Sequence, residues 1–126
     1  MRPLTTEWVA KAEGDRAPLL RERRARAAPN YDAACFHAQQ CAEKYLKARL
    51  HEAGISFGKT HDIERLLDLA LPIETSWEPL RADLIALTDF AVEFRYPGSA
   101  AVRADMLESA RICERVRALV RSSLGM

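Results

Sequence analysis

The longest regular pattern of hydrophobic and polar positions runs from Tyr31 to Ala53, a stretch without Gly or Pro that consists mostly of good helix formers. At about 100° per residue, its polar side chains fall on one narrow stripe with apolar residues on both flanks. The stripe consists of His37, Gln40, Lys44, Lys47 and His51. A helix that is apolar over most of its girth is typical of a central helix packed on several neighbours. The polar stripe must then face solvent, a cleft or a partner subunit.

The residues before this stretch predict a first long helix. Thr5 or Thr6 can cap its start, and the helix continues until shortly before Pro29. Its apolar residues share one face: Trp8, Val9, Ala12, Leu19 and Leu20. Pro18 removes a backbone donor whose acceptor would belong to Gly14, and a glycine leaves room for the proline ring. We therefore expect one kinked helix rather than two separate helices.

The central helix has signals at both of its ends, and a short helix follows it. Asn30 is a natural cap for its start, and Gly54 is typical of a helix end. After a loop, Thr60 or His61 is expected to cap a third helix, which Pro72 ends. The apolar face of this short helix consists of Ile63, Leu66, Leu67 and Ala70.

Two further helices are predicted in the second half of the chain. Thr75 and Glu78 have the spacing of a capping box, and the fourth helix that follows them ends near Arg95. Its apolar seam consists of Leu80, Leu84, Leu87, Ala91 and Phe94. Ser99 is expected to cap a fifth helix. The inward face of that helix consists of Val102, Met106, Ala110 (or Leu107), Cys113, Val116 and Val120.

No segment alternates between apolar and polar residues as a strand would, and no repeat or long linker divides the chain. We therefore predict an all-α fold: an up-and-down helical bundle of four long helices plus one short helix, in a single domain over residues 1–126.

Composition narrows the function only a little. A chain with 48% apolar and 29% charged residues is an ordinary globular protein, and a net charge of +1 argues against general binding to nucleic acids or membrane surfaces. The basic run from Arg21 to Arg26 is expected to be a solvated helix face. No apolar run approaches the roughly 18 residues that cross a bilayer, and the N-terminus lacks the apolar segment of a signal peptide. A cytoplasmic protein is expected.

The three cysteines are Cys35, Cys41 and Cys113, and they show no CxxC spacing. Cys35 and Cys41 point about 240° apart on one helix, so they cannot share a metal ion. We expect buried, reduced thiols, with neither a metal site nor a cofactor.

Three segments together resemble the HEPN domain of prokaryotes. They are Phe36–Ala48, Lys59–Ile63 and Arg95–Pro97, and the resemblance extends from Trp8 to Val120. It implies a helical bundle that often forms a symmetric homodimer. It also implies partnership with a minimal nucleotidyltransferase in a toxin–antitoxin system. Many HEPN proteins are metal-independent ribonucleases that use an Arg and a His separated by four to six residues, brought together across the dimer interface.

The chain departs from that ribonuclease motif. No Arg lies five to seven positions before His37, His51 or His61, and the corresponding positions after Arg95 hold Ala100 to Val102. Ribonuclease activity therefore does not carry over from the family, and we expect a binding or interaction module rather than an enzyme.

Two kinds of site remain open. A divergent ribonuclease acting on tRNA or mRNA could use His37 and His61 for proton transfer and Lys44, Lys59 or Arg95 for the phosphate charge. Alternatively, Lys44, Lys59 and Arg95 could bind a nucleotide phosphate.

Structural roles compete with both of these sites. Lys44 could pair with Asp15 of the first helix, and Glu43 with Lys47 on the central helix. His37 could make a contact between helices or subunits, and His61 could belong to a helix cap.

Overall fold

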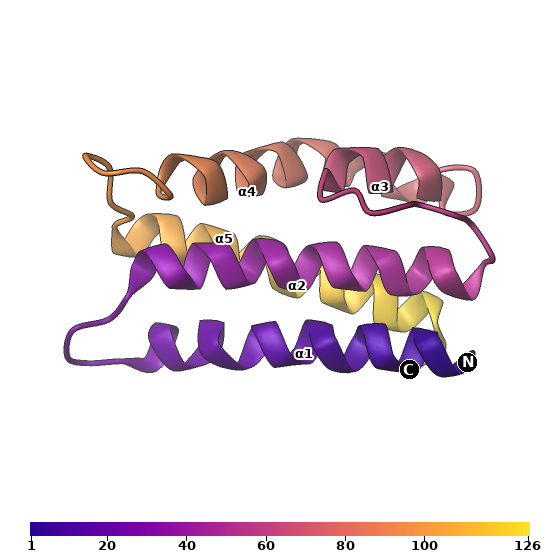
Figure 1. The fold of residues 1–126 in the computed structure, drawn as a ribbon, viewed down its shortest axis with the longest axis horizontal. Helices are drawn as coiled ribbons and strands as arrows, with labels where there is room; N and C mark the ends of the chain where they lie inside the picture. Colours follow the sequence, from indigo (N-terminus) through magenta and orange to yellow (C-terminus); the bar gives the residue numbers. More distant parts are fainter.

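The computed structural model describes residues 1–126, all of whose regular structure is helical, and it confirms the predicted all-α bundle. The chain forms four long helices, which lie side by side in Figure 1, with a short helix and a 3₁₀ helix between the second and third of them along the chain. The elements are α1 (Pro3–Arg24), α2 (Tyr31–Glu52), α3 (Ile63–Ala70), η1 (Thr75–Leu80), α4 (Arg81–Glu93) and α5 (Arg103–Ser123). None of these helices is long and apolar enough to cross a lipid bilayer.

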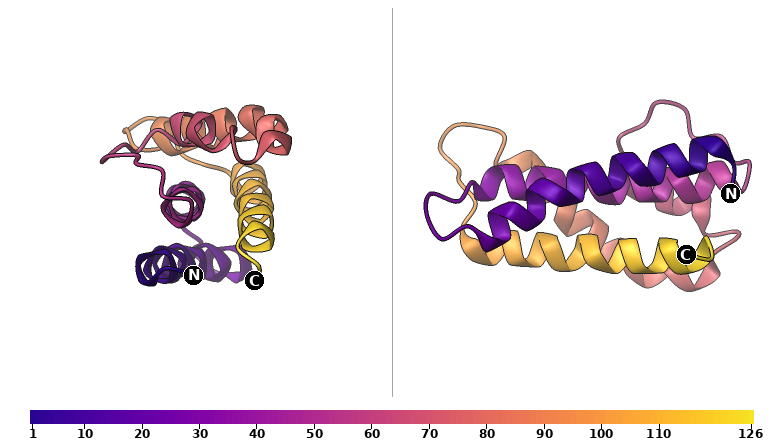
Figure 2. Two further views of the ribbon diagram at one scale, coloured as in Figure 1. Left: turned by 90° about the vertical axis from the view of Figure 1, so that its right-hand side faces the viewer. Right: turned by 90° about the horizontal axis from the view of Figure 1, so that it is seen from below.

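Helix α2 is the centre of the bundle, as its pattern predicts. It packs against α1, α3, α4 and α5, and the end-on view shows α1, α5 and α4 around three of its sides (Figure 2). Its ends are those expected. Asn30 Oδ1 accepts a hydrogen bond from the Ala33 amide at 2.9 Å. Gly54 adopts a left-handed conformation (φ 73°), which lets the Ile55 amide bond to the Leu50 carbonyl.

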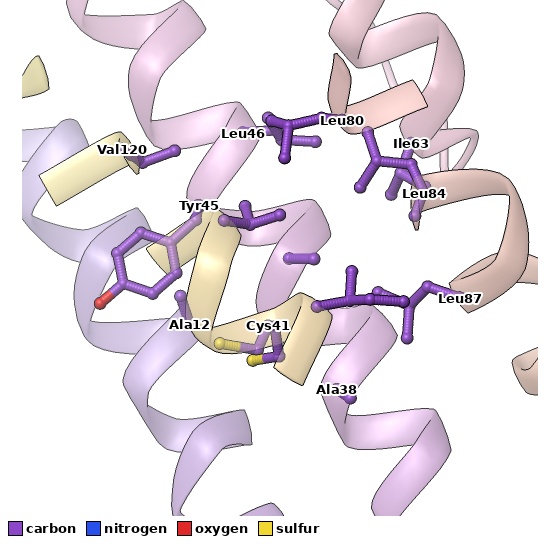
Figure 3. Close-up of a cluster of buried hydrophobic side chains, with 14 of the residues drawn as sticks. Ala12, Ala38, Cys41, Tyr45, Leu46, Ile63, Leu80, Leu84, Leu87 and Val120 are labelled. Carbon is purple, nitrogen blue, oxygen red and sulfur yellow. The ribbon is translucent and has the colours of Figure 1, made fainter. Parts of the chain in front are cut away.

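The buried side chains form one connected core to which every helix contributes. Figure 3 shows part of this core, with Ala12 of α1, Tyr45 of α2 and Val120 of α5 on one side and Leu84 of α4 on the other. All three cysteines are buried and reduced. The neighbouring Cys113 thiol and burial both raise the pKa of Cys41 well above its ordinary value, so this thiol stays protonated.

The helix starts differ from the predicted ones, beginning with α1. This helix begins at Pro3 rather than after Thr5 or Thr6, because proline suits the first helical position, where its missing amide hydrogen costs nothing. Thr5 lies buried within the helix and donates its hydroxyl hydrogen to Glu52 at 2.9 Å. The helix continues through Pro18 without a break, which confirms one helix rather than two.

The caps predicted for the third, fourth and fifth helices were also wrong. Asp62 caps α3 in place of Thr60 or His61, since its carboxylate accepts two backbone hydrogen bonds. The predicted capping box at Thr75 opens the 3₁₀ helix η1 instead, and Glu78 binds Arg81 at 2.7 Å.

Helix α5 starts after Val102 rather than after Ser99. The Asp105 carboxylate accepts a hydrogen bond from the Val102 amide at 2.9 Å, which fixes the start there. Val102 is exposed, so it does not belong to the inward face predicted for it.

Ion pairs join α1 to α5, whose backbones approach each other at few points. Arg16 contacts Glu114 at 2.6 Å, and Arg117 contacts Glu13 at 2.7 Å. Burial tends to raise the pKa of Glu13, but the hydrogen bonds and charge of Arg117 outweigh it and hold that pKa below its ordinary value. These pairs fix the orientation of the two helices more than they stabilise the fold, because partly exposed pairs contribute little.

Candidate functional site

Two acidic side chains make contacts with the polar stripe of α2 and divide it into two parts. The first is Asp15 of α1, which is largely buried. It contacts His37 Nδ1 at 2.9 Å and also binds the ammonium group of Lys44. These two stripe residues therefore hold α1 against α2. The competing structural interpretation of Lys44, as the partner of Asp15, agrees with this contact.

The second acidic side chain is Glu43, which is only 2% exposed. Its Oε2 lies 3.4 Å from Lys47 Nζ and 3.2 Å from His61 Nδ1. Lys47 is itself buried, and its ammonium lies over the rings of Trp8 and Phe57, 5.4 and 5.6 Å from their centroids. Contact with aromatic faces compensates a buried cation for part of its lost hydration.

A cleft of about 350 Å³ lies next to this second cluster, between α2, α4 and the residues that precede α3. It is lined by Gln39, Gln40, His61, Thr88, Ala91, Val92 and Arg95. The two glutamine side chains are joined by a hydrogen bond of 2.8 Å from Gln40 Nε2 to Gln39 Oε1. The cleft therefore presents amide, imidazole and guanidinium groups together.

A second hollow of about 330 Å³ continues from this cleft along α2 and α4. It is lined by Asn30, Asp32, Ala33, Phe36, Ala91, Phe94 and Arg95. Ala91 and Arg95 line both spaces, so Arg95 lies where the cleft and the hollow meet. Arg95 is exposed and takes part in none of the salt bridges of the protein, whereas nine other lysine and arginine side chains do.

The structure brings together only some of the candidate residues. His61 and Arg95 line the same cleft, although they are far apart in sequence. His37 and Lys44 instead contact Asp15, and Lys59 is exposed and lines neither space. Of the three cations predicted to bind nucleotide, only Arg95 therefore lies in the cleft, and nucleotide binding stays a prediction.

Several residues of the cleft were not predicted as site residues. Gln40 belongs to the polar stripe and could have been chosen for that reason, but nothing in the sequence singles out Thr88. The contact between Glu43 and His61 depends on the path of the loop before α3, which no spacing rule describes. No group of three or more His, Cys, Asp or Glu side chains is placed to hold a metal ion.

The fold and the cleft together define a class of protein, the up-and-down helical bundles with a polar cleft beside the central helix. The sequence matches the model of the HEPN domain over residues 5–123, which is almost the whole chain. The protein belongs to the HEPN family. No curated protein sequence matches the chain.

Two solved structures share the fold over nearly their whole lengths. TT1696 from Thermus thermophilus superimposes with a TM-score of 0.74 at 24% identity, and the match covers 96% of this chain and 98% of that one. ST0689, described as an archaeal HEPN homologue, superimposes with a TM-score of 0.67 at 26% identity, and 98% of each chain is covered.

Replacing Asp15 with Ala should lower the free energy of unfolding by about 2 kcal/mol, because Lys44 and His37 lose a shared, largely buried acceptor. Urea unfolding followed by circular dichroism measures the change. The control is Lys11→Ala, which removes an exposed charge from the same helix and should change stability by less than about 0.5 kcal/mol. Equal effects of the two substitutions would contradict the role of Asp15.

Proposed function

We propose that this HEPN protein is a binding module that holds the phosphate of a nucleotide in the cleft between α2 and α4. One observation carries the proposal: His61 and Arg95, from segments far apart in sequence, line one cleft, and Arg95 has no carboxylate partner. A guanidinium offers a planar fork of donors that matches the oxygens of a phosphate group. A protonated imidazole adds a further charged donor.

The shape of the cleft also supports a small ligand. Its volume of about 350 Å³ is within the range typical of small-molecule sites, and the adjoining hollow extends it. Gln39 and Gln40 carry both donors and acceptors, which suits the edge of a nucleobase. Lys44 is left out of this site because Asp15 already neutralises its charge.

Replacing Arg95 with Ala should weaken ATP binding about tenfold or more, since a charge-assisted contact to phosphate is lost. Isothermal titration calorimetry measures the dissociation constant. Arg65→Ala is the matched control, because Arg65 is also exposed and forms no salt bridge but does not line the cleft. The proposal fails if neither ATP nor GTP binds the wild-type protein at millimolar concentration, or if both substitutions have the same effect.

We further propose that a second protein chain covers the rim of the cleft. Exposed apolar side chains gather there: Phe36 lines the hollow, Val92 lines the cleft, and Tyr96 follows Arg95. Apolar side chains grouped on one face are typical of interaction surfaces. The family resemblance suggests the partner, either a second copy of this chain in a homodimer or a nucleotidyltransferase-like protein of a toxin–antitoxin system.

A charge at this rim should prevent self-association. Val92→Asp is expected to shift the protein from dimer to monomer in sedimentation velocity, because an unpaired carboxylate would be buried at the interface. Leu107→Asp is the control, as Leu107 is about equally exposed but lies on α5. A wild-type protein that is monomeric at high micromolar concentration would exclude the homodimer and leave the heterologous partner.

A divergent ribonuclease is the second candidate, and the same pairing of His61 with Arg95 favours it. The imidazole could transfer a proton while the guanidinium stabilises the charge of the phosphorane. The missing Arg–His spacing and the contact of His37 with Asp15 count against this candidate.

Cleavage assays separate the two functions. The binding proposal expects purified protein to leave tRNA and mRNA intact in EDTA. Cleavage that persists in EDTA and disappears in His61→Ala would replace the binding proposal with the ribonuclease. His37→Ala is the control, because His37 lies outside the cleft and its loss should not affect such cleavage.

A further inference from the structure

Glu43 is the most unusual polar residue of the protein. One of its carboxylate oxygens, Oε1, is completely buried and has no hydrogen-bond partner. The other oxygen has only the two rather long contacts to Lys47 and His61. Removing a carboxylate from water without satisfying both oxygens is costly, so such a group calls for an explanation beyond stability.

The residue that depends on Glu43 is His61. The side chain of His61 is 79% exposed, and it precedes α3 in a segment that contributes it to the wall of the cleft. Its contact with Glu43 Oε2 at 3.2 Å is its one polar contact within the protein. Without that contact, the imidazole would be free to rotate in solvent.

We infer that Glu43 is a positioning residue for His61, which it holds in one tautomer with Nε2 free for a ligand in the cleft. The inference rests on the proposed function for the ligand, but the positioning itself does not need one. Glu43 forms an ion pair with the buried ammonium of Lys47, and the carboxylate of such a pair can only accept hydrogen bonds. The facing Nδ1 must therefore carry a hydrogen, and the Nε2 atom faces away from the carboxylate.

This arrangement serves both protonation states of His61. In the neutral ring, Nε2 is an acceptor of a proton or a hydrogen bond. In the imidazolium, Nδ1–H binds Glu43 while Nε2–H is available to a phosphate oxygen. A fixed ring also loses less conformational entropy when the ligand binds. Lys47 also belongs to this arrangement, because its ammonium contacts the same Glu43 oxygen that faces His61.

Long-range ¹H–¹⁵N NMR of the imidazole rings tests the tautomer without any ligand. The chain holds only three histidines, and two of them serve as references. His37 also faces a carboxylate through Nδ1, so it should show the same Nδ1–H form, whereas the His51 side chain has no polar partner and should show the Nε2–H form that free histidine prefers. Nδ1–H at His61 in the wild-type protein is the expected result. Nε2–H there would overturn the inference.

Two variants show whether Glu43 is the cause. Glu43→Met combined with Lys47→Met removes the acceptor and the buried ion pair together, a replacement that folded proteins often tolerate. It should shift His61 alone to the Nε2–H form. Lys47→Arg, which keeps a cation beside Glu43, is the matched control and should leave the Nδ1–H form in place. An unchanged His61 tautomer in a folded double variant would overturn the inference, and unchanged backbone amide spectra outside the cluster confirm folding.

ATP titration of the same samples keeps this inference separate from the proposed function. We expect the Nε2 resonance of His61 to move on ATP addition and the double variant to bind ATP about tenfold more weakly, as His61→Ala should. If the tautomer is the expected one but ATP moves no His61 resonance, then contact between ATP and His61 is refuted while the role of Glu43 in holding the ring is supported.

Discussion

The position of α2 inside the bundle is the constraint on which the rest of the structure depends. Four helices pack against it, so most of its surface must be apolar, and the side chains of its polar stripe share one narrow strip of that surface. The polar groups of this strip therefore lie close together on one side of the helix. The cleft, the contact to α1 and the loop before α3 all lie along it, which explains why so many ionisable side chains of a modestly charged protein are found close together.

Asp15 and Glu43 give the two parts of that strip different properties. Asp15 contacts Lys44 and His37 at once, so both side chains hold two helices together. Glu43 is less well satisfied, and its histidine remains largely exposed. A buried acid with fully engaged partners is typical of a structural role, whereas one that leaves its partner accessible is typical of a site. The proposed site is therefore at the Glu43 end of the stripe.

The hydrophobic periodicity of the sequence and the local preferences of single residues predicted the helices and some of their ends. The central helix, its cap at Asn30, its end at Gly54 and the Leu84–Leu87 seam follow from spacing alone. Helix starts were less predictable because several residues near each start could act as the cap, as Thr60, His61 and Asp62 illustrate. The approach of His61 to Glu43 and Arg95 could not be derived, since it depends on how a loop and the end of α4 fold back onto α2.

The unequal burial of the charges has a consequence for ionic strength. Lys47 and Glu43 are almost completely shielded from solvent, so mobile ions hardly weaken their attraction, whereas the guanidinium of Arg95 is fully open to them. Raising the salt concentration would therefore reduce the pull of the cleft on an anion while the framework behind His61 keeps its shape. A charged ligand bound as proposed would then be released by the ionic surroundings alone, without any rearrangement of the helices.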